Sequence, residues 1–312
     1  MVDLVTTGYL TLDDLVLADG RVLRDTLGGG ALYSAVGALS WGASVGIHAC
    51  SGADYPPRFL RQIAAAGIDA RGVTVGPERG LRLWLLEEGE SRKQQLPKLT
   101  SASVAEMDAN RGPLPASYTS AAGFHVATSL PDTQRRIVSD IHRLAPEGVI
   151  SLDIWTESFF DLSPYREPSF LAGIDAFLPS DKEVEALWGL DDLAGTLRRL
   201  SAAGPRVVAV KRGSLGSLVY DRERDTLWEI PAAPVQAVDT IGAGDAYCGG
   251  FLAGLVETGD PLDAGLRGAV SASFAIEDHG AQAGMNADRS EAERRLRALR
   301  GRVRQVGAGA MP

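Results

Sequence analysis

Residues 239–251 read Asp239-Thr240-Ile241-Gly242-Ala243-Gly244-Asp245-Ala246-Tyr247-Cys248-Gly249-Gly250-Phe251, a glycine-rich turn that runs directly into an apolar, helix-compatible segment. Gly242 and Gly244 permit a tight bend and let a ligand approach the backbone, because glycine has no Cβ. The first amides of a helix lack intrahelical acceptors and lie at the positive end of its dipole, so this turn suits an anion. Asp245 would then lie beside a bound phosphate, where a carboxylate can accept a proton from an attacking hydroxyl. The short pattern Gly-x-Gly-Asp alone is equally typical of an ordinary helix start with an acidic first turn.

The complete string is far more specific, and it resembles the C-terminal motif of the ribokinase-like (PfkB) carbohydrate kinases. The resemblance extends over essentially the whole chain and implies MgATP-dependent phosphorylation of a small-molecule alcohol. It assigns the role of catalytic base to Asp245. It also assigns to the amides around Gly242, Ala243 and Gly244 the stabilisation of charge on the transferring phosphoryl group.

A second motif, near the N-terminus, is similar to the other signature of this family. Gly28-Gly29-Gly30 opens a segment whose apolar residues recur at i, i+3, i+4 and i+7, which predicts a helix. A strand at 44–49 follows, and then Gly52-Ala53-Asp54. The resemblance implies that the backbone of Gly29 and Gly30 contacts the phosphate acceptor. Tyr33 stands where the family usually has an acceptor-binding Asn, so we expect Tyr33 in this pocket and altered sugar contacts.

Composition excludes several classes of partner. The 312 residues are 45% apolar, which is ordinary for a globular protein, and the formal net charge of −9 argues against nucleic acid or an anionic membrane. Cys50 and Cys248 are too few for a disulfide framework and fit a reducing compartment. The N-terminus shows no signal peptide, and no apolar run is long enough to span a bilayer. We expect a cytoplasmic protein.

Short β-type runs alternate with amphipathic segments along most of the chain. This alternation predicts an α/β fold with a doubly wound, mostly parallel sheet and helices on both faces, in one ribokinase-like domain over 1–312. Strands are expected at 4–8, 45–49, 123–127, 149–153, 176–179 and 207–211, and helices at 57–66, 132–144, 182–188 and 191–202. Ligands of such sheets bind at the carboxyl ends of the strands, so Asp153 is a candidate for a place near the site, and a helix cap after the strand is an equally good explanation of this residue. A capping box at Ser290 predicts the start of a C-terminal helix.

Two segments, approximately 11–27 and 73–96, interrupt the alternation and look like pairs of strands. The family resemblance implies that they form a small β lid over the substrate. In the second segment Leu83 and Leu85 alternate with Arg82 and Trp84, so one side of the sheet is buried and the other faces solvent or ligand. Trp84 would stack on a sugar or base, or else pack in the lid or an interface. Arg82 is expected to be a solvated strand residue.

Asp13 follows the first expected strand and is the candidate sugar-binding carboxylate. The resemblance places an Asp shortly after this strand in contact with two sugar hydroxyls, and a carboxylate can accept from two hydroxyls at once. We favour Asp13 over Asp14 by its distance from Gly8, while a turn-forming role for the pair remains open.

Glu183 is the candidate metal residue. Ser180-Asp181-Lys182-Glu183 stands where the family usually has Asn-x-x-Glu, a motif that organises Mg²⁺ and phosphates through water. Here Ser180 replaces the Asn. Ser180 and Glu183 also form a capping box, which explains both residues without a metal.

The nucleotide side of the site is expected on two segments. Residues 208–216 resemble the strand and turn that follow the ATP phosphates in the family, with Lys211 in reach of a phosphate and Gly213 and Gly216 in a tight hairpin. Residues Ala275 to Gly280 should border the adenine. The cofactors implied are ATP and Mg²⁺; a monovalent cation is left open.

Competing motifs are absent or misplaced. There is no Gly-x4-Gly-Lys-Ser/Thr, and the four histidines show no zinc spacing. We therefore expect an ATP-dependent kinase for a hydroxyl of a sugar or sugar acid. The alternatives are a nucleoside kinase of the same fold, with Trp84 and Tyr33 against the base, and a non-catalytic sugar- or nucleotide-binding relative. A homodimer formed through the lid is left open.

Overall fold

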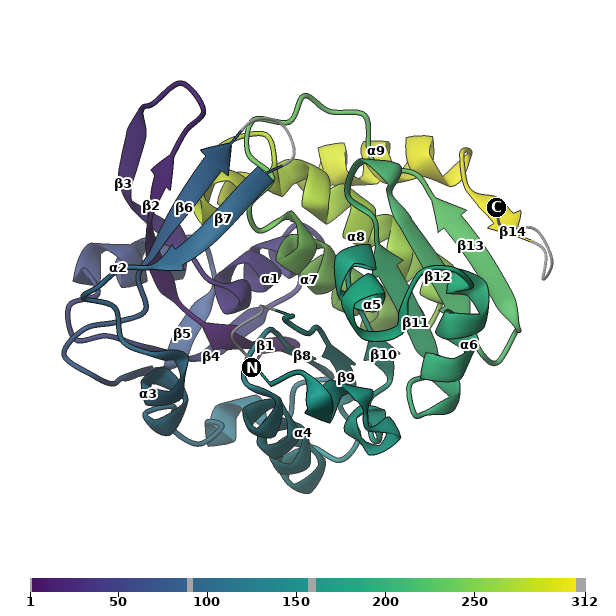
Figure 1. Ribbon diagram of the computed structural model, residues 1–312, viewed down its shortest axis with the longest axis horizontal. Coiled ribbons are helices and arrows are strands. Elements are labelled where there is room, and N and C mark those ends of the chain that lie inside the picture. Colours follow the sequence, from purple (N-terminus) through teal and green to yellow (C-terminus); the bar gives the residue numbers. More distant parts are fainter. Residues whose placement is uncertain (1, 89–91, 157–160, 307–312) are drawn as a thin grey trace.

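A large twisted sheet forms the body of the protein in this computed structural model, which describes residues 2–88, 92–156 and 161–306 (Figure 1). Within those residues the sheet has ten strands in the order β14-β13-β12-β11-β10-β9-β8-β1-β4-β5. Neighbours from β5 to β11 are parallel, and β12 to β14 extend the sheet antiparallel at one edge. The expected doubly wound, mostly parallel fold is confirmed.

The strands of the large sheet are β1 (Leu4–Tyr9), β4 (Val45–Ser51), β5 (Asp69–Val75), β8 (Gly123–Val126), β9 (Val149–Leu152), β10 (Ala176–Phe177), β11 (Val207–Lys211), β12 (Ser217–Asp221), β13 (Thr226–Ile230) and β14 (Arg304–Val306). The helices are α1 (Gly30–Leu39), α2 (Pro57–Ala65), α3 (Val104–Ala109), α4 (Pro131–Leu144), α5 (Asp181–Trp188), α6 (Leu193–Ala202), α7 (Ala243–Thr258), α8 (Pro261–Ala275) and α9 (Arg289–Arg300). Every strand and helix expected from the alternation is present, with ends shifted by a few residues.

Helices cover both faces of the sheet because successive strand residues point to opposite sides. In β1, Leu4 packs into the core formed with α1, α7 and α8, whereas Val5 packs into the core formed with α4, α5 and α6. The helices α1 and α7 cross in close contact: a Cβ on Gly249 would lie 1.8 Å from the carbonyl oxygen of Ser34. Glycine is therefore required at this crossing, which holds the starts of the two helices side by side.

A separate four-stranded sheet, the lid, rises from one end of the molecule (Figure 1). Its strands are β2 (Thr11–Val16), β3 (Val22–Gly28), β6 (Leu83–Glu88) and β7 (Arg92–Pro97), in the order β3-β2-β6-β7. Both expected lid segments supply strands to it. Residues 73–75, however, belong to β5 of the large sheet, so the second lid segment begins later than the sequence suggested.

The two faces of the lid differ in character. On the inner face Leu15, Leu85 and the half-buried Leu83 pack with Ile241 of the glycine-rich turn. On the outer face Asp14 lies opposite Trp84 in the β2–β6 pairing, and the Lys98 ammonium lies 4.7 Å from the centre of the Trp84 ring. Asp13 alternates with Asp14 and therefore faces inward.

The predicted start of the C-terminal helix was wrong. The C-terminal helix α9 begins at Arg289 with Asp288 as its N-cap, whose side chain accepts from the Ser290 amide, rather than at Ser290. Aspartate and serine are equally good N-caps, so the sequence alone does not separate the two starts. No helix among the described residues is both long and apolar enough to cross a membrane.

Candidate active site

The glycine-rich turn forms the N-terminus of the sixteen-residue helix α7. Gly242 is its N-cap in the left-handed conformation, with φ of 75°, which favours glycine. Asp239 accepts a hydrogen bond from the Ile241 amide at 2.9 Å, and the amide of Val238 donates to the carbonyl of Ile276 at 2.7 Å, so the turn is fixed before the helix begins. The first-turn amides of α7 follow this turn and have no intrahelical acceptors, so they remain the candidate anion-binding site.

Asp245 lies in the first turn of α7 and faces the start of α1. A Cβ on Gly30 would lie 2.8 Å from Oδ1 of Asp245, so only a glycine leaves this carboxylate room. Burial, together with the negative charge of Asp153, raises the pKa of Asp245 from its ordinary 3.8 to about 7. A carboxylate of that pKa can accept a proton near neutral pH.

Asp13 lies on the other side of the same glycine triplet. A Cβ on Gly28 would lie 2.2 Å from Oδ2 of Asp13, and Thr11 donates to that oxygen at 2.6 Å. The other oxygen, Oδ1, is buried and accepts no hydrogen bond of normal length among the described residues, while the backbone amide of Leu83 lies close enough to the carboxyl to lower its pKa. Burial raises the pKa of Asp13 to about 7. A buried acceptor that lacks a hydrogen bond of normal length suits a ligand hydroxyl, because an unmade hydrogen bond is costly.

The two carboxylates thus bracket one short stretch of backbone. Asp13 contacts Gly28, Asp245 contacts Gly30, and between them Gly29 has φ of 102° and packs directly on the carbonyl oxygen of Tyr9. An uncharged strip of backbone without side chains therefore lies between Asp13, whose Oδ1 is buried, and Asp245, the candidate base. Such a strip fits a small alcohol whose hydroxyls reach both carboxylates.

Tyr33 is buried and its ring covers the glycine-rich turn. A Cβ on Gly242 would lie 2.2 Å from Cδ1 of Tyr33. Burial raises the pKa of Tyr33 well above its ordinary value, and the charges of Asp239, Asp13 and Asp245 act in the same direction. Tyr33 therefore lies within electrostatic reach of both candidate carboxylates, where it supports the turn.

A buried ion pair lies beside the first turn of α7. Lys211, at the end of β11, pairs with Asp153, which follows β9, and also contacts Sγ of Cys248 in α7 at 3.5 Å. A Cβ on Gly244 would lie 3.6 Å from the Lys211 nitrogen, so the ammonium stands beside the turn. Burial opposes the charge, yet Asp153, Cys248 and Glu183 hold the pKa of Lys211 above its usual range. Lys211 is thus a fixed cation next to the first turn of α7.

Glu183 forms the capping box with Ser180 that begins α5. The Ser180 amide donates to Glu183 Oε2 at 2.6 Å, and the Glu183 amide donates to Ser180 Oγ at 3.3 Å. Burial, with the nearby charge of Asp153, raises the pKa of Glu183 to about 7. Glu183 therefore makes both hydrogen bonds of the capping box. Its carboxylate also lies near the Lys211–Asp153 pair.

The acidic groups near Lys211 fit a magnesium ion held mainly through water and phosphate. Among the described residues no three His, Cys, Asp or Glu side chains are grouped closely enough to form a metal site by themselves. Glu183 and Asp153 are close enough for their charges to interact, a repulsion that a divalent cation would relieve. Mg²⁺ commonly keeps several waters and is bound by one or two carboxylates together with substrate phosphates.

The other predicted site residues lie around Asp13, Asp245 and Lys211 rather than among them. Gly213 and Gly216 both have positive φ and form the turn between β11 and β12, directly after Lys211. Ala275 is buried at the end of α8. Gly280 faces the lid, since a Cβ there would lie 2.4 Å from Cγ2 of Thr26 in β3. Trp84 pairs with Asp14 on the outer face of the lid, whereas Asp13 is on the inner face. The structure therefore does not bring Trp84 to Asp13 and Asp245.

Arg82 was expected to be a solvated strand residue, and the structure gives it a different role. Its side chain is only 17% exposed and donates to Asp54 Oδ2 at 2.9 Å and to Asp25 Oδ1 at 3.3 Å. Asp54 also accepts from the Gly80 amide at 2.8 Å. Because Asp54 belongs to the loop after β4 and Asp25 to β3, Arg82 ties the lid to the body. The Gly52-Ala53-Asp54 motif was the available signal.

The site combines a glycine-rich helix start, two buried carboxylates and a strip of glycine backbone, next to the small lid sheet, and the fold together with this site is that of a small-molecule kinase. The chain belongs to the pfkB family of carbohydrate kinases, whose family pattern it matches over residues 9–288. It is 29% identical to the cytidine kinase of Thermococcus kodakarensis, over 86% of this chain and 93% of that protein.

Solved structures agree on the fold. A putative ribokinase II from E. coli superposes with a TM-score of 0.80 at 21% identity, covering 96% of this chain and all of that one. The same protein in complex with ATP and Mg²⁺ gives a TM-score of 0.77. The nucleoside kinase of Methanocaldococcus jannaschii gives 0.71 at 19% identity, over 95% of this chain and 98% of that chain.

Proposed function

We propose that this protein transfers the γ-phosphoryl group of ATP to a hydroxyl of a sugar or sugar acid, with Asp245 as general base. The observation that carries the proposal is the pair of carboxylates, Asp13 and Asp245, on either side of the Gly28–Gly30 backbone, which leads into α1, with Asp245 in the first turn of α7. Asp13 has a buried oxygen that could accept a hydrogen bond from the acceptor hydroxyl, and Asp245 lies at the N-terminus of α7, the proposed anion site.

In the proposed reaction the acceptor hydroxyl is held between these two groups. Its oxygen forms a bond to the γ-phosphorus while the bond from that phosphorus to the leaving oxygen of ADP breaks. The hydroxyl proton passes to Asp245, whose pKa of about 7 suits proton transfer at neutral pH. The first amides of α7 stabilise the charge on the transferring group, and Lys211 adds a fixed positive charge beside Gly244.

ATP would lie with its phosphates along the turn that contains Gly213 and Gly216 and against Lys211, where backbone and cation are both available. Ala275 and Gly280 would border the base. Glu183, with Asp153 beside it, is the candidate for ordering the water around Mg²⁺. When bound, the ion neutralises phosphate charge during transfer.

A nucleoside kinase is the second candidate. It is favoured by one observation: the similarity to the cytidine kinase of T. kodakarensis extends over 86% of this chain. A ribose hydroxyl would occupy the strip between Asp13 and Asp245 in the same way. The base would need a different partner from Trp84, which faces outward in this structure.

A panel of sugars, sugar acids and nucleosides separates these candidates, with ADP release from ATP as the readout. We expect one class to raise ADP release well above the acceptor-free rate. The Asp245→Asn variant serves as the control for contaminating activity. If no compound raises ADP release, although ATP binds, the non-catalytic alternative holds and the proposed function is wrong.

Glu183→Gln is expected to raise the magnesium requirement with little change in thermal stability. Glutamine can still accept the Ser180 amide, so the capping box survives while the charge is lost. The measurement is activity against free Mg²⁺, with Ser180→Ala as the matched variant that weakens the cap and leaves the charge. An unchanged magnesium dependence in Glu183→Gln would leave Glu183 a helix-capping role only.

Lys211→Met is expected to lower kcat by about 10²–10³-fold, the usual cost of removing one group that stabilises transition-state charge. The substitution also strands the buried Asp153 carboxylate and should destabilise the protein, because breaking a buried pair commonly costs about 3–5 kcal/mol. The double variant Lys211→Met/Asp153→Asn removes that unpaired charge. Recovery of stability without recovery of kcat supports the proposal; recovery of both assigns Lys211 a structural role.

The acceptor kcat/KM is expected to rise with pH through about 7 and then level off, because Asp245 must be deprotonated to act as base. The stability of the ligand-free protein should change in the opposite sense. Asp13, Asp245 and Glu183 bind protons more tightly folded than unfolded, so stability falls as pH rises from about 4 to about 7. Rate profiles and melting temperatures across this range test both trends; a flat rate profile would contradict the assignment.

A further inference from the structure

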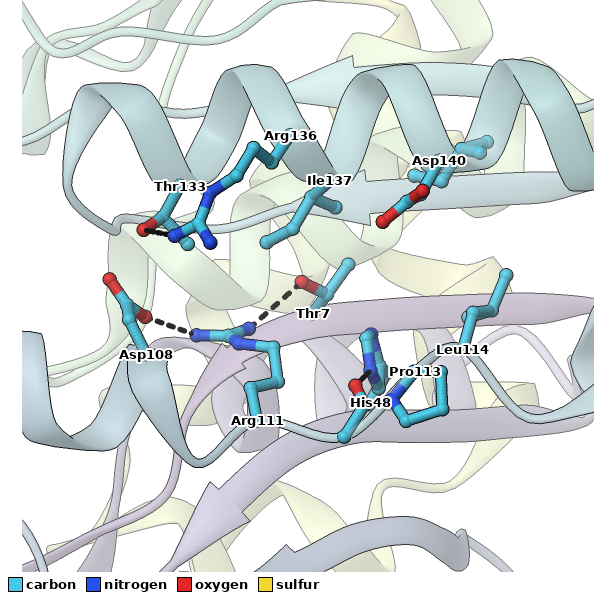
Figure 2. Close-up of a pocket in the computed structure, with 12 residues that line it drawn as sticks. Thr7, His48, Asp108, Arg111, Pro113, Leu114, Thr133, Arg136, Ile137 and Asp140 are labelled. Atoms are coloured by element: carbon cyan, nitrogen blue, oxygen red, sulfur yellow. Dashed lines mark hydrogen bonds and ion pairs between the residues drawn. The ribbon is translucent and has the colours of Figure 1, made fainter.

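Figure 2 shows a cavity away from the candidate active site. It lies on the face of the sheet that packs against α4, whereas α1 and α7 pack against the other face. It has a volume of about 110 Å³ and lies between α4 and the strands β1 and β4. Thr7 and His48 project into it from the strands, and Thr133 and Ile137 from the helix. Asp245 and the glycine triplet lie beyond β1, on the other side of the sheet, so this cavity is separate from the candidate active site.

The charged groups that form its inner wall neutralise one another. Arg111 donates to Asp108 Oδ1 at 2.9 Å and to Thr7 Oγ1 at 3.1 Å, and the side chains of the pair are only 4% and 3% exposed. His48 contacts the carbonyl of Gly112 through Nε2 at 2.8 Å, and burial lowers its pKa to about 4, so it is uncharged near neutral pH. Since a carbonyl only accepts, His48 carries its proton on Nε2, and Nδ1 is an acceptor.

Three of these side chains keep one polar atom unused. His48 Nδ1, Asp108 Oδ2 and Arg111 Nε are each buried and make no hydrogen bond of normal length among the described residues, although Asp108 also interacts with the buried hydroxyl of Tyr9. Two are acceptors and one is a donor, and they come from β4, from the end of α3 and from the loop after it. Buried polar groups normally have partners, so unpaired polar atoms on three side chains that line one cavity favour an occupant that can pair with them.

The pattern of unused atoms defines the chemistry of that occupant. An anion would meet the free oxygen of Asp108, and a cation would meet the guanidinium of Arg111. A hydroxyl group can both donate and accept, so a molecule with several hydroxyls satisfies all three atoms without adding charge. Ordered water satisfies the same atoms, and the experiment below separates it from a ligand.

Size and access agree with a small ligand. Because one water occupies about 30 Å³ in the liquid, the cavity has room for a molecule of roughly three carbons with its hydroxyls. An adjoining cavity of about 390 Å³, between α3 and the start of α4, shares Asp108, Thr133 and Arg136 with it. The shared lining makes this neighbouring cavity the candidate entrance, with room for a longer chain.

We propose that this cavity is a binding site for a small uncharged polyhydroxy compound, separate from the acceptor site. His48, Asp108 and Arg111 bind its hydroxyls, and Thr133 and Arg136 line its entrance. The site needs no ATP and does not depend on the kinase activity, so it stands even if the proposed function fails.

Calorimetry and saturation-transfer NMR on the full chain, with glycerol, erythritol and xylitol as probes, test the proposal. Ile137→Phe fills the cavity from α4 without removing a polar group, and His48→Phe fills it from β4 and removes Nδ1. We expect saturable binding to the wild type, at least about tenfold weaker binding to both variants, and unchanged binding to Asp13→Ala, whose acceptor site is altered. The Ile137→Phe result keeps the test valid if His48→Phe fails to fold.

Several results would overturn the proposal. Absence of saturable binding by all three probes would mean that the cavity holds only water. Binding that is lost in Asp13→Ala but kept in Ile137→Phe would place the probes in the acceptor site. Glycerol 3-phosphate and 3-amino-1,2-propanediol serve as charged probes: tighter binding of either, lost in Ile137→Phe, would contradict the uncharged class.

Discussion

Asp245→Asn is expected to lower kcat by about 10²–10⁴-fold, with ATP and acceptor affinities nearly unchanged. Asparagine has the shape of aspartate and fits beside Gly30, but it cannot accept the hydroxyl proton. The helix start and the Asp13 side of the pocket remain as they are, so binding should survive. Single-turnover rates and separate binding titrations distinguish a loss of chemistry from a loss of binding.

Two controls accompany this variant. Asp132→Asn makes the same chemical change in the first turn of α4, where the side chain is 88% exposed, and should leave kcat unaltered. Asp245→Asn should also be at least as stable as the wild type at pH 8 without ligand, because it removes a carboxylate whose pKa burial has raised. Wild-type turnover in a folded Asp245→Asn protein would remove Asp245 from the mechanism.

Asp13→Ala is expected to weaken acceptor binding and lower kcat/KM, with ATP affinity little changed. Hydrogen bonds to a charged group contribute about 1.5–3 kcal/mol each, which corresponds to roughly 10- to 150-fold in affinity. The buried oxygen that accepts no hydrogen bond of normal length is the reason to expect a direct contact. Calorimetric titration with the best acceptor from the panel measures the effect.

The neighbouring residue provides a matched control. Asp14→Ala removes a carboxylate from the same strand, but on the outer lid face, where it pairs with Lys98 at 2.8 Å and accepts from the Asp25 amide at 2.9 Å. This variant should loosen the lid and leave direct acceptor contacts in place, so its effect on acceptor affinity should be the smaller. Equal acceptor affinities in wild type and Asp13→Ala would reduce Asp13 to a residue of the lid strand.

The sequence predicted those features that depend on local pattern or on a specific motif. Alternating strands and helices gave the parallel sheet, and the strings around Gly28–Gly30 and Asp245 pointed to the two helix starts that the structure brings together. Asp153 was expected near the site because it follows a strand, and the structure places it against Lys211, beside Gly244. In each case a short segment identifies the residue, and the sheet topology then places it in the site.

Features that depend on how segments pack were not predictable. The alternation around Trp84 indicated two unlike lid faces, but not which face is turned to the site, since that depends on the contact of Leu15 and Leu85 with Ile241. The Lys211–Asp153 pair needs the strand order β9-β10-β11, which the sequence does not specify. Residues 73–75 have the same β-type character in either sheet, so their place in β5 could not be read in advance.

The central claim is that a phosphoryl group passes from ATP to an acceptor hydroxyl with the help of Asp245. Phosphorus NMR of the wild-type reaction with the best acceptor tests it most directly, because it follows ATP, ADP, inorganic phosphate and product together. We expect a new phosphomonoester signal that grows in step with ADP in the wild type and is nearly absent with Asp245→Asn. Formation of ADP with inorganic phosphate alone, or an equal yield of phosphomonoester from the two proteins, would contradict the account.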